Sequence, residues 1–341
     1  MNRTISWALT GGTALLATRF LARRQREISW TNRTVFVTGG SRGLGLELAR
    51  QLVDAGANVA ICARDRDDLS RARRILKRRA KHVGQKVKVL ALPCDVTDPA
   101  QVKKTVATIT KTIGPIDALI NNAGIIQVGP LAEMEQREYE EAINTHYWGP
   151  WNTIQAVLPG MRERGEGRII NIASVGGKVS IPHLHPYSAS KHALVGLSEG
   201  YRTELQRENI YVTTVCPGLI RTGSPKNATF KGRHRAEQEW FTISDSLPGL
   251  TMSSGETARA VLEAGRYGKS TVVLSLPAKL IAGLNGVAPQ LVSEVSSLVN
   301  RWLPDPGGIG NERATGEESA SEWSPSFLTR LTQKAARRNN Q

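Results

Sequence analysis

Short apolar runs alternate with longer amphipathic segments along most of this chain. The apolar runs cover residues 34–38, 58–63, 87–92, 118–121, 168–173, 211–216 and 271–276. Runs that are apolar throughout predict strands buried on both faces, and the segments of helical period between them predict helices that cover the strands. The pattern therefore predicts the α/β class: a doubly wound parallel sheet of seven strands, a Rossmann fold, in a single domain.

Two segments depart from this alternation. Residues 217–255 mix Gly, Pro, Ser, Lys and Arg with the apolar pair Trp240 and Phe241, directly after a predicted strand. Open α/β sheets bind ligands at the carboxyl ends of their strands, so we expect a substrate loop here. Farther on, large apolar residues recur every three or four positions over 280–302, which predicts an amphipathic helical extension that is kinked or divided at Pro289.

The chain thus divides into four parts. Residues 1–30 form an N-terminal arm, residues 31–276 the main domain, residues 277–303 the helical extension, and residues 304–341, rich in Gly, Glu, Ser and Pro, are typical of a flexible tail. The uncharged stretch of the arm, 5–18, is shorter than the roughly 20 apolar residues that a membrane span needs. Basic residues follow it, so the arm is either an interfacial anchor or a weakly ordered terminus.

The chain is strongly basic. Its 341 residues include 45 Lys and Arg against 30 Asp and Glu, a net charge of +15. Such a charge favours an anionic partner, which is nucleic acid, an acidic membrane surface or an anionic cofactor. No aromatic residues interleave with the basic runs to stack on bases, so we expect no nucleic acid. Three cysteines without metal-ligand spacing indicate a reducing compartment and no metal site, so we expect a cytoplasmic protein, with membrane association left open.

The first predicted strand runs into a glycine-rich turn. The turn reads Thr38-Gly39-Gly40-Ser41-Arg42-Gly43-Leu44-Gly45, and a helical segment follows it. Glycines at positions 39, 43 and 45 permit a tight turn and the close approach of a diphosphate, and the helix N-terminus behind them supplies free N–H groups. The turn therefore predicts a site for a dinucleotide cofactor.

The second predicted strand ends in Ala63 and Arg64. NAD sites usually carry an acidic residue at this place, which binds the hydroxyls of the adenosine ribose. Here Ala63 takes that place, and the planar guanidinium of Arg64 suits a 2′-phosphate. Arg42, in the glycine-rich turn, is a second candidate for the same phosphate. The missing acid and the two arginines predict NADP(H) as the cofactor.

A third motif carries proton-transfer chemistry. Tyr187-Ser188-Ala189-Ser190-Lys191 places a phenol and an ammonium on one face of a predicted helix. A free tyrosine has a pKa of about 10, too high for efficient proton transfer at neutral pH, and a nearby cation lowers that pKa. Ser174 directly follows the strand at 168–173, at the end where ligands bind, whereas His146 is read as structural.

These motifs follow one another in a recognisable order. Asn121-Asn122-Ala123-Gly124 closes the fourth predicted strand, and Pro217-Gly218 follows the sixth. With the glycine-rich turn, the serine and the Tyr-x-x-x-Lys motif, they make the chain resemble the short-chain dehydrogenase/reductase family over about residues 34–276. The resemblance also implies a homodimer or homotetramer, paired through helices near 139–164 and 187–209.

The resemblance implies a role for each candidate residue. Tyr187 would be the general acid in reduction and the general base in oxidation, and Lys191 would lower its pKa and bind the nicotinamide ribose. Ser174 would donate a hydrogen bond to the substrate oxygen, and Asn144 would position a water that relays protons. The implied cofactor residues are Gly39, Ser41, Arg42, Gly43, Leu44, Gly45, Arg64, Asp95, Val96, Asn122, Ala123, Gly124, Tyr187, Lys191, Pro217, Gly218, Ile220 and Thr222.

We therefore expect an NADP(H)-dependent oxidoreductase that moves a hydride between the nicotinamide and a carbonyl or secondary alcohol carbon. The apolar residues of the substrate loop favour an apolar or lipid-like substrate: Phe230, Trp240, Phe241 and Leu247. The alternative is a protein that binds NADP(H) as a scaffold or sensor without turnover. The complete catalytic set favours the enzyme.

Overall fold

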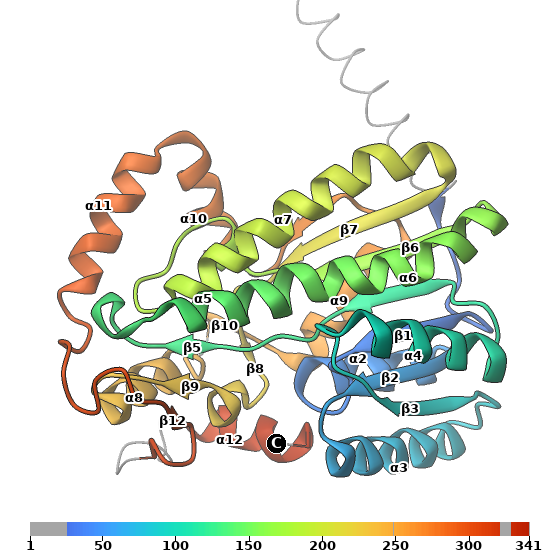
Figure 1. The fold of residues 1–341 in the computed structure, drawn as a ribbon, viewed down its shortest axis with the longest axis horizontal. Coiled ribbons are helices and arrows are strands. Elements are labelled where there is room, and N and C mark those ends of the chain that lie inside the picture. Colours follow the sequence, from blue (N-terminus) through green and yellow to red (C-terminus); the bar gives the residue numbers. More distant parts are fainter. Residues whose placement is uncertain (1–25, 248, 321–328, 341) are drawn as a thin grey trace, which may run out of the picture.

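The computed structural model describes residues 26–247, 249–320 and 329–340. At its centre, seven parallel strands follow the order β11-β7-β6-β4-β1-β2-β3, with helices on both faces (Figure 1). The strands are β1 (Thr34–Thr38), β2 (Asn58–Ala63), β3 (Val89–Pro93), β4 (Ala118–Asn121), β6 (Gly167–Ile172), β7 (Ile210–Cys216) and β11 (Thr271–Val273). This sheet confirms the doubly wound fold that the apolar runs predict.

The largest differences between the strands and the apolar runs are at β3 and β11, and the other boundaries agree to within one residue. β3 begins two residues later than predicted, and β11 ends at Val273 although the apolar run continues to 276. The cause at β11 is Ser275, whose φ of 72° turns the chain and whose side chain accepts a hydrogen bond from the Ala278 amide. This N-cap begins helix α10 (Leu276–Val287) where the run of apolar residues would otherwise extend the strand.

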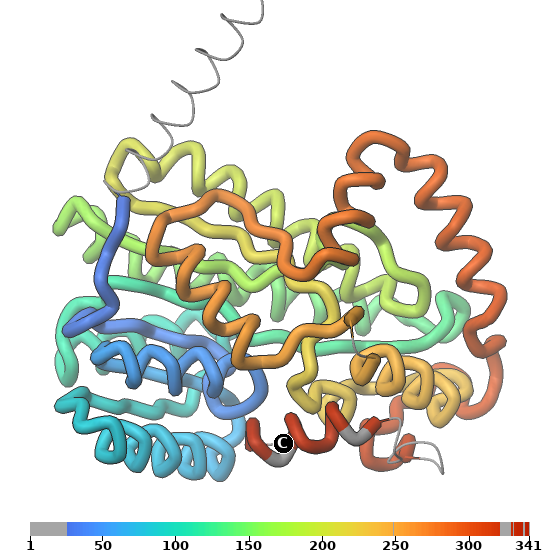
Figure 2. Tube along the Cα trace, turned by 180° about the vertical axis from the view of Figure 1, so that it is seen from behind, coloured from blue at the N-terminus to red at the C-terminus, as the bar shows by residue number. Residues whose placement is uncertain are grey.

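Helices cover each face of the sheet and bury its core. One face carries α2 (Gly43–Asp54), α3 (Arg66–His82) and α9 (Ser254–Arg266), of which α2 and α9 lie in front in Figure 2. The other face carries α4 (Pro99–Thr112), α6 (Gly149–Arg164) and α7 (His185–Leu205). Leucines such as Leu46, Leu48 and Leu52 on α2 are fully buried, and each contributes about 1.5–3 kcal/mol to folding. The strand ends that form the site are therefore held by a rigid core.

Residues 217–255 fold into short elements above the carboxyl ends of the strands. They are β8 (Leu219–Arg221), the 3-10 turn η5 (Ser224–Asn227), β9 (Thr229–Phe230), α8 (His234–Ser244) and β10 (Thr251–Ser253). β8 pairs with β10, and β9 lies between β5 (Gln127–Val128) and β12 (Ala314–Thr315). A small apolar cluster that includes Phe230 and Phe241 stabilises this region. The segment that sequence composition marks as a substrate loop is thus an ordered cover.

The amphipathic extension forms two helices. α10 ends at Val287, and α11 (Pro289–Asn300) begins at Pro289, where the sequence predicts a kink or division. The pair stands at one end of the molecule in Figure 1. Among the described residues, no helix is both long and apolar enough to span a bilayer. Residues 1–25 of the N-terminal arm lie outside the described residues, which begin at Arg26.

The C-terminal residues return to the glycine-rich turn. α12 (Arg330–Arg338) ends where the Gly43 amide donates to the Asn339 carbonyl oxygen at 2.9 Å and the Asn340 side-chain amide donates to the Ser41 carbonyl oxygen at 2.9 Å. Toward its other end, the hydroxyls of Thr332 and Ser246 lie 2.7 Å apart. α12 therefore bridges the substrate loop and the glycine-rich turn, although the composition of 304–341 is typical of a flexible tail.

Candidate active site

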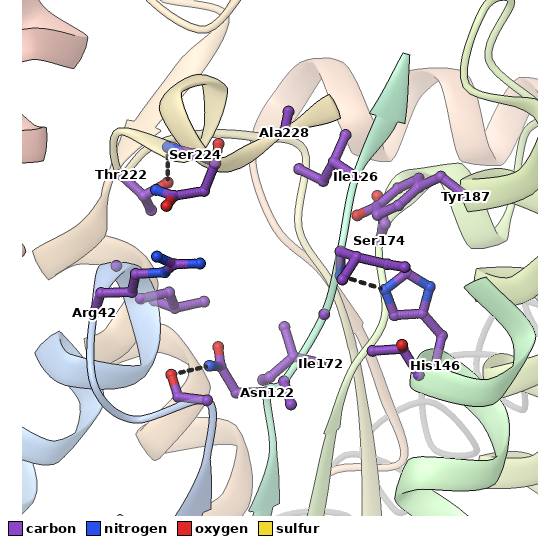
Figure 3. Close-up of a pocket in the computed structure, with 18 of the residues that line it drawn as sticks. Arg42, Asn122, Ile126, His146, Ile172, Ser174, Tyr187, Thr222, Ser224 and Ala228 are labelled. Atoms are coloured by element: carbon purple, nitrogen blue, oxygen red, sulfur yellow. Dashed lines mark hydrogen bonds between the residues drawn. The ribbon is translucent and has the colours of Figure 1, made fainter. Parts of the chain in front are cut away.

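A cavity of about 720 Å³ opens at the carboxyl ends of the central strands. The glycine-rich turn and the ends of β2, β3, β4, β6 and β7 form one part of its wall, and the substrate loop forms another. Figure 3 shows Arg42 and Asn122 on one side of the cavity and Ser174, Tyr187 and His146 on the other. The cavity thus joins the predicted cofactor residues to the predicted catalytic residues.

The glycine-rich turn is shaped by close backbone packing. Gly39 has a φ of +62°, and a Cβ atom on it would lie 2.8 Å from the Cα atom of Ala123. A Cβ atom on Gly45 would lie 2.2 Å from the Gly39 carbonyl oxygen. The Asn122 side-chain amide donates to the Thr38 and Gly39 carbonyl oxygens, both at 3.1 Å, and so holds the turn against β4. Only glycine fits these two positions, which leaves the N-terminus of α2 open to the cavity.

Two guanidinium groups stand at the end of the cavity formed by the glycine-rich turn and β2. Arg42 and Arg64 both line it, and Arg42 lies 3.5 Å from the Asp68 carboxylate. Burial lowers the pKa of Arg42, Asp68 opposes that change, and the charge of Arg64 adds to it. The acid nearest the end of β2 is Asp65, which caps α3 by accepting the Asp68 amide at 2.7 Å. This arrangement offers positive charge to an anion, and the glycine cradle beside it fits a dinucleotide.

Tyr187, Ser174 and Lys191 meet at the opposite side of the cavity. Burial raises the pKa of Tyr187 to about 12, and the neighbouring Ser174 hydroxyl partly offsets that rise. Lys191 donates to the Ile172 carbonyl oxygen at 2.9 Å, its Nζ atom lies 5.5 Å from the centre of the Tyr187 ring, and burial lowers its pKa to about 7. At neutral pH the phenol is therefore protonated, which is the form that donates a proton to a carbonyl oxygen.

The structure does not bring Asn144 to this cavity. α5 (Gln136–Ile143) passes into a π-helical turn, Asn144–Trp148, before α6 begins, and the Asn144 side chain is exposed. A π turn holds more residues than an α turn, so it changes which side chains face inward. The residue of this turn that is buried in the wall is His146, which is 1% exposed. The resemblance implied that Asn144 takes part in the site, and the structure places His146 at the wall instead, because the π-helical turn changes which side chains face the cavity.

His146 links three parts of the site. Its Nε2 atom accepts a hydrogen bond from the Ile125 amide at 3.2 Å, so the ring proton is assigned to Nδ1, which lies 2.8 Å from the Ser190 hydroxyl. Ser190 in turn donates to the Tyr187 carbonyl oxygen at 2.9 Å. Burial, together with the charge of Lys191, lowers the pKa of His146 well below its usual value, so the ring is neutral. The contacts position the Tyr187 helix against the loop after Gly124.

Most of the other residues expected in the site line the cavity, and a few do not. Apart from Asn144 and Gly45, all the catalytic and cofactor residues inferred from the sequence line the cavity. Gly45 does not line it, but its lack of a side chain allows the close packing of the turn. Of the apolar residues expected in the substrate loop, only Phe241 reaches the wall, because Phe230 and Trp240 pack in the neighbouring cluster and Leu247 is 40% exposed. Sequence reasoning missed wall residues from several elements: Ile126, His146, Ile181, Leu184, Ser224, Ala228 and Asp245.

The fold is that of a dinucleotide-binding protein, and one cavity joins the glycine-rich turn to Ser174, Tyr187 and Lys191. A model described as short chain dehydrogenase matches residues 33–231, more than half of the chain. The chain therefore belongs to the short-chain dehydrogenase/reductase family, whose members use a nicotinamide cofactor.

Several known proteins are similar to this chain. A putative ketoacyl reductase of Streptomyces coelicolor is 34% identical over 267 residues, which cover 77% of this chain and 96% of that protein. The mouse protein named dehydrogenase/reductase SDR family member 7B is 32% identical over 274 residues, 80% of this chain and 83% of its own length. Among solved structures, L-sorbose reductase from Gluconobacter frateurii, complexed with NADPH and L-sorbose, has a TM-score of 0.62 at 26% identity and covers 72% of this chain and 95% of that chain.

Proposed function

We propose that this protein is an NADP(H)-dependent reductase of carbonyl compounds with an apolar body. The observation that carries the proposal is the single cavity in which Arg42 and Arg64 stand at one end and Tyr187 and Ser174 at the other. One elongated dinucleotide with a 2′-phosphate would account for both ends, since Arg42 and Arg64 would bind its charged adenosine part and the Tyr187 side of the cavity would hold its nicotinamide.

The chain's own residues supply binding and proton transfer. Amides at the N-terminus of α2 and of the glycine-rich turn would bind the diphosphate of the cofactor, which would supply the hydride for the carbonyl carbon. Ser174 donates a hydrogen bond to the carbonyl oxygen, which gains negative charge, and Tyr187 transfers its phenolic proton to that oxygen. The product is the alcohol, and the charge of protonated Lys191 stabilises the phenolate that remains.

The wall beside Tyr187 supports an apolar substrate. Its side chains come from α8 and three connecting segments and are largely hydrocarbon: Ile125, Ile126, Ile181, Leu184, Ala228 and Phe241. Burying a substrate of the same character there removes apolar surface from water on both sides, at roughly 25 cal/mol for each Å². The predicted substrate class is a ketone or aldehyde on an apolar skeleton.

Mixing the full-length protein with NADPH and a panel of aliphatic, cyclic and aromatic ketones and aldehydes tests the proposal. We expect oxidation of NADPH, followed by its absorbance, with the larger apolar carbonyl compounds and much slower oxidation of NADH. A protein that binds NADPH tightly in a fluorescence titration yet reduces no member of the panel would instead be the scaffold or sensor. Faster turnover with NADH would refute the cofactor assignment.

We further propose that the α10–α11 pair associates with a membrane surface. Ten large apolar side chains of the pair and its end are exposed, with Val287 at 83% and Trp302 at 85%. Only three charged residues, Lys279, Glu294 and Arg301, interrupt residues 276–302. Many exposed apolar side chains on one helix pair are typical of an interaction site, and a helix pair lying flat at an interface would bury them.

Flotation of the full-length protein with liposomes containing acidic lipid tests this association. We expect part of the wild type to float, and we expect the double variant Leu280→Glu/Leu298→Glu to remain in the dense fraction, because two buried carboxylates oppose insertion. Leu250→Glu, at a site that is 46% exposed away from the pair, is the matched control and should float as the wild type does. If nothing floats and the double variant loses a homodimer in light scattering, the surface is a subunit interface.

A further inference from the structure

One carboxyl group in the cavity has no place in the mechanism above. Asp245 caps the C-terminal end of α8, is 3% exposed and lines the same cavity as Tyr187. It is close enough to Tyr187 for its charge to raise the pKa of the phenol. Its neighbour one turn earlier on the helix, Phe241, belongs to the apolar wall. An acidic group is therefore buried in the substrate half of the site.

The surroundings of Asp245 disfavour its ionised form. Burial raises its pKa to about 7. The C-terminal end of a helix carries partial negative charge, which adds to the cost of a carboxylate there. Among the described residues no Lys, Arg or His nitrogen comes within 4.0 Å of the Asp245 carboxyl, and its one side-chain hydrogen bond, from the Ser224 hydroxyl, is 3.3 Å long. The group is thus poorly compensated by the protein itself.

A second buried acid on the same helix shows what a structural carboxylate looks like here. Glu237 is fully buried, lies 2.7 Å from Nδ1 of His183 and accepts a hydrogen bond from the Trp240 indole at 2.6 Å. Its oxygens are occupied by partners that hold the helix in place. Asp245 lacks such partners and borders the cavity instead, so its spare hydrogen-bonding capacity is available to a ligand.

Building on the proposed function, we propose that Asp245 selects the substrate by binding a hydrogen-bond donor that the substrate carries apart from its reacting carbonyl. The donor is a hydroxyl or an ammonium group, since both can donate to a carboxylate. The substrate is then amphipathic. Its hydrocarbon part lies against Ile181, Leu184 and Phe241, its carbonyl oxygen meets Tyr187, and its donor group reaches Asp245.

Matched substrates provide the direct test. Three series of ketones share one apolar skeleton and differ only in an unsubstituted, a hydroxyl-bearing or an amino-bearing position away from the carbonyl. We expect the wild type to reduce one donor-bearing series with a kcat/KM about 10–100-fold above the unsubstituted series. Asp245→Leu should bring that ratio close to one. Asp245→Asn should abolish a preference for ammonium but only weaken a preference for hydroxyl, which identifies the donor.

Two further measurements separate this inference from the proposed function. Calorimetric titration of the NADPH-free and NADPH-bound protein with the same ketones reads discrimination by binding, so it remains informative if no ketone is reduced and the reductase proposal fails. The unfolding temperature of the ligand-free protein at pH 8 should rise in Asp245→Asn, because a poorly compensated buried carboxylate is removed. In Glu237→Gln it should fall.

Glu239→Gln is the control for loss of charge on α8, since Glu239 does not line the cavity, and it should keep the wild-type ratio. Equal kcat/KM and equal binding for all three series in the wild type would overturn the inference. So would a marked loss of stability in Asp245→Asn, which would make Asp245 a structural carboxylate like Glu237.

Discussion

Replacing Tyr187 with Phe should lower kcat for carbonyl reduction by about 10²–10⁴-fold, the usual contribution of a general acid. The substitution removes the phenolic hydroxyl, whose proton the proposed mechanism transfers to the carbonyl oxygen. It keeps the ring, which packs edge-on against His146 with 5.4 Å between the ring centres. NADPH affinity, measured by fluorescence titration, should therefore stay close to that of the wild type while turnover is lost.

The matched control is Tyr139→Phe, because Tyr139 also hydrogen-bonds through its hydroxyl, to His185 at 2.8 Å, but does not line the cavity. This variant should keep most of its activity. If Tyr187→Phe retains more than roughly a tenth of wild-type kcat on a confirmed substrate, the proton comes from another group. His146, which is neutral and buried beside the phenol, would then be the first residue to examine.

Substituting two residues at the end of β2 should reverse the proposed preference for NADPH over NADH. In Ala63→Asp/Arg64→Ala, a carboxylate replaces the methyl group and the guanidinium next to it is removed. The carboxylate repels a 2′-phosphate and accepts hydrogen bonds from a free ribose. A hydrogen bond to a charged group contributes about 1.5–3 kcal/mol, so the ratio of NADPH to NADH dissociation constants should change by roughly 10²-fold or more.

Two neighbouring charged residues, Asp65 and Arg42, affect the size of the expected change in cofactor preference. Asp65 cannot take the part of the missing acid, because its side chain already caps α3. Arg42 remains, partly neutralised by Asp68 at 3.5 Å, so some affinity for the phosphate should persist. Arg66→Ala, an exposed arginine on α3 outside the cavity, is the control and should leave the preference unchanged. A wild type that binds NADH more tightly in the same titration contradicts the assignment.

The strands and the glycine-rich turn are readable from sequence because their signals are local. β1, β2 and β4 coincide with their apolar runs, since a strand buried on both faces must be apolar along its whole length. The tight turn requires glycine at 39 and 45 because backbone atoms approach where a side chain would lie. The Tyr187–Lys191 spacing places two groups on one helical face whatever surrounds the helix.

The wall around those groups depends on contacts between distant parts of the chain. Asn144 and His146 are two residues apart, and only the π-helical turn determines that the histidine faces the cavity. Asp245 is one acid among 30 Asp and Glu residues until α8 is packed over the strand ends and buries it. Local sequence patterns record propensity and amphipathic faces, but not the phase of an irregular turn or the packing of a loop.

At the C-terminal helix, the expectation from sequence and the structure differ most. Its composition and that of the residues before it are typical of a flexible tail, because few large apolar side chains are available to bury. In the structure, the Gly43 amide donates to the Asn339 carbonyl oxygen and the Asn340 side-chain amide donates to the Ser41 carbonyl oxygen, which joins segments almost 300 positions apart. The sequence by itself determined the sheet, the glycine-rich turn and the spacing of Tyr187 and Lys191, whose requirements are met within a few neighbouring residues. Tertiary structure alone decided which side chains line the cavity around them, because that wall is made by segments that meet only in the folded chain.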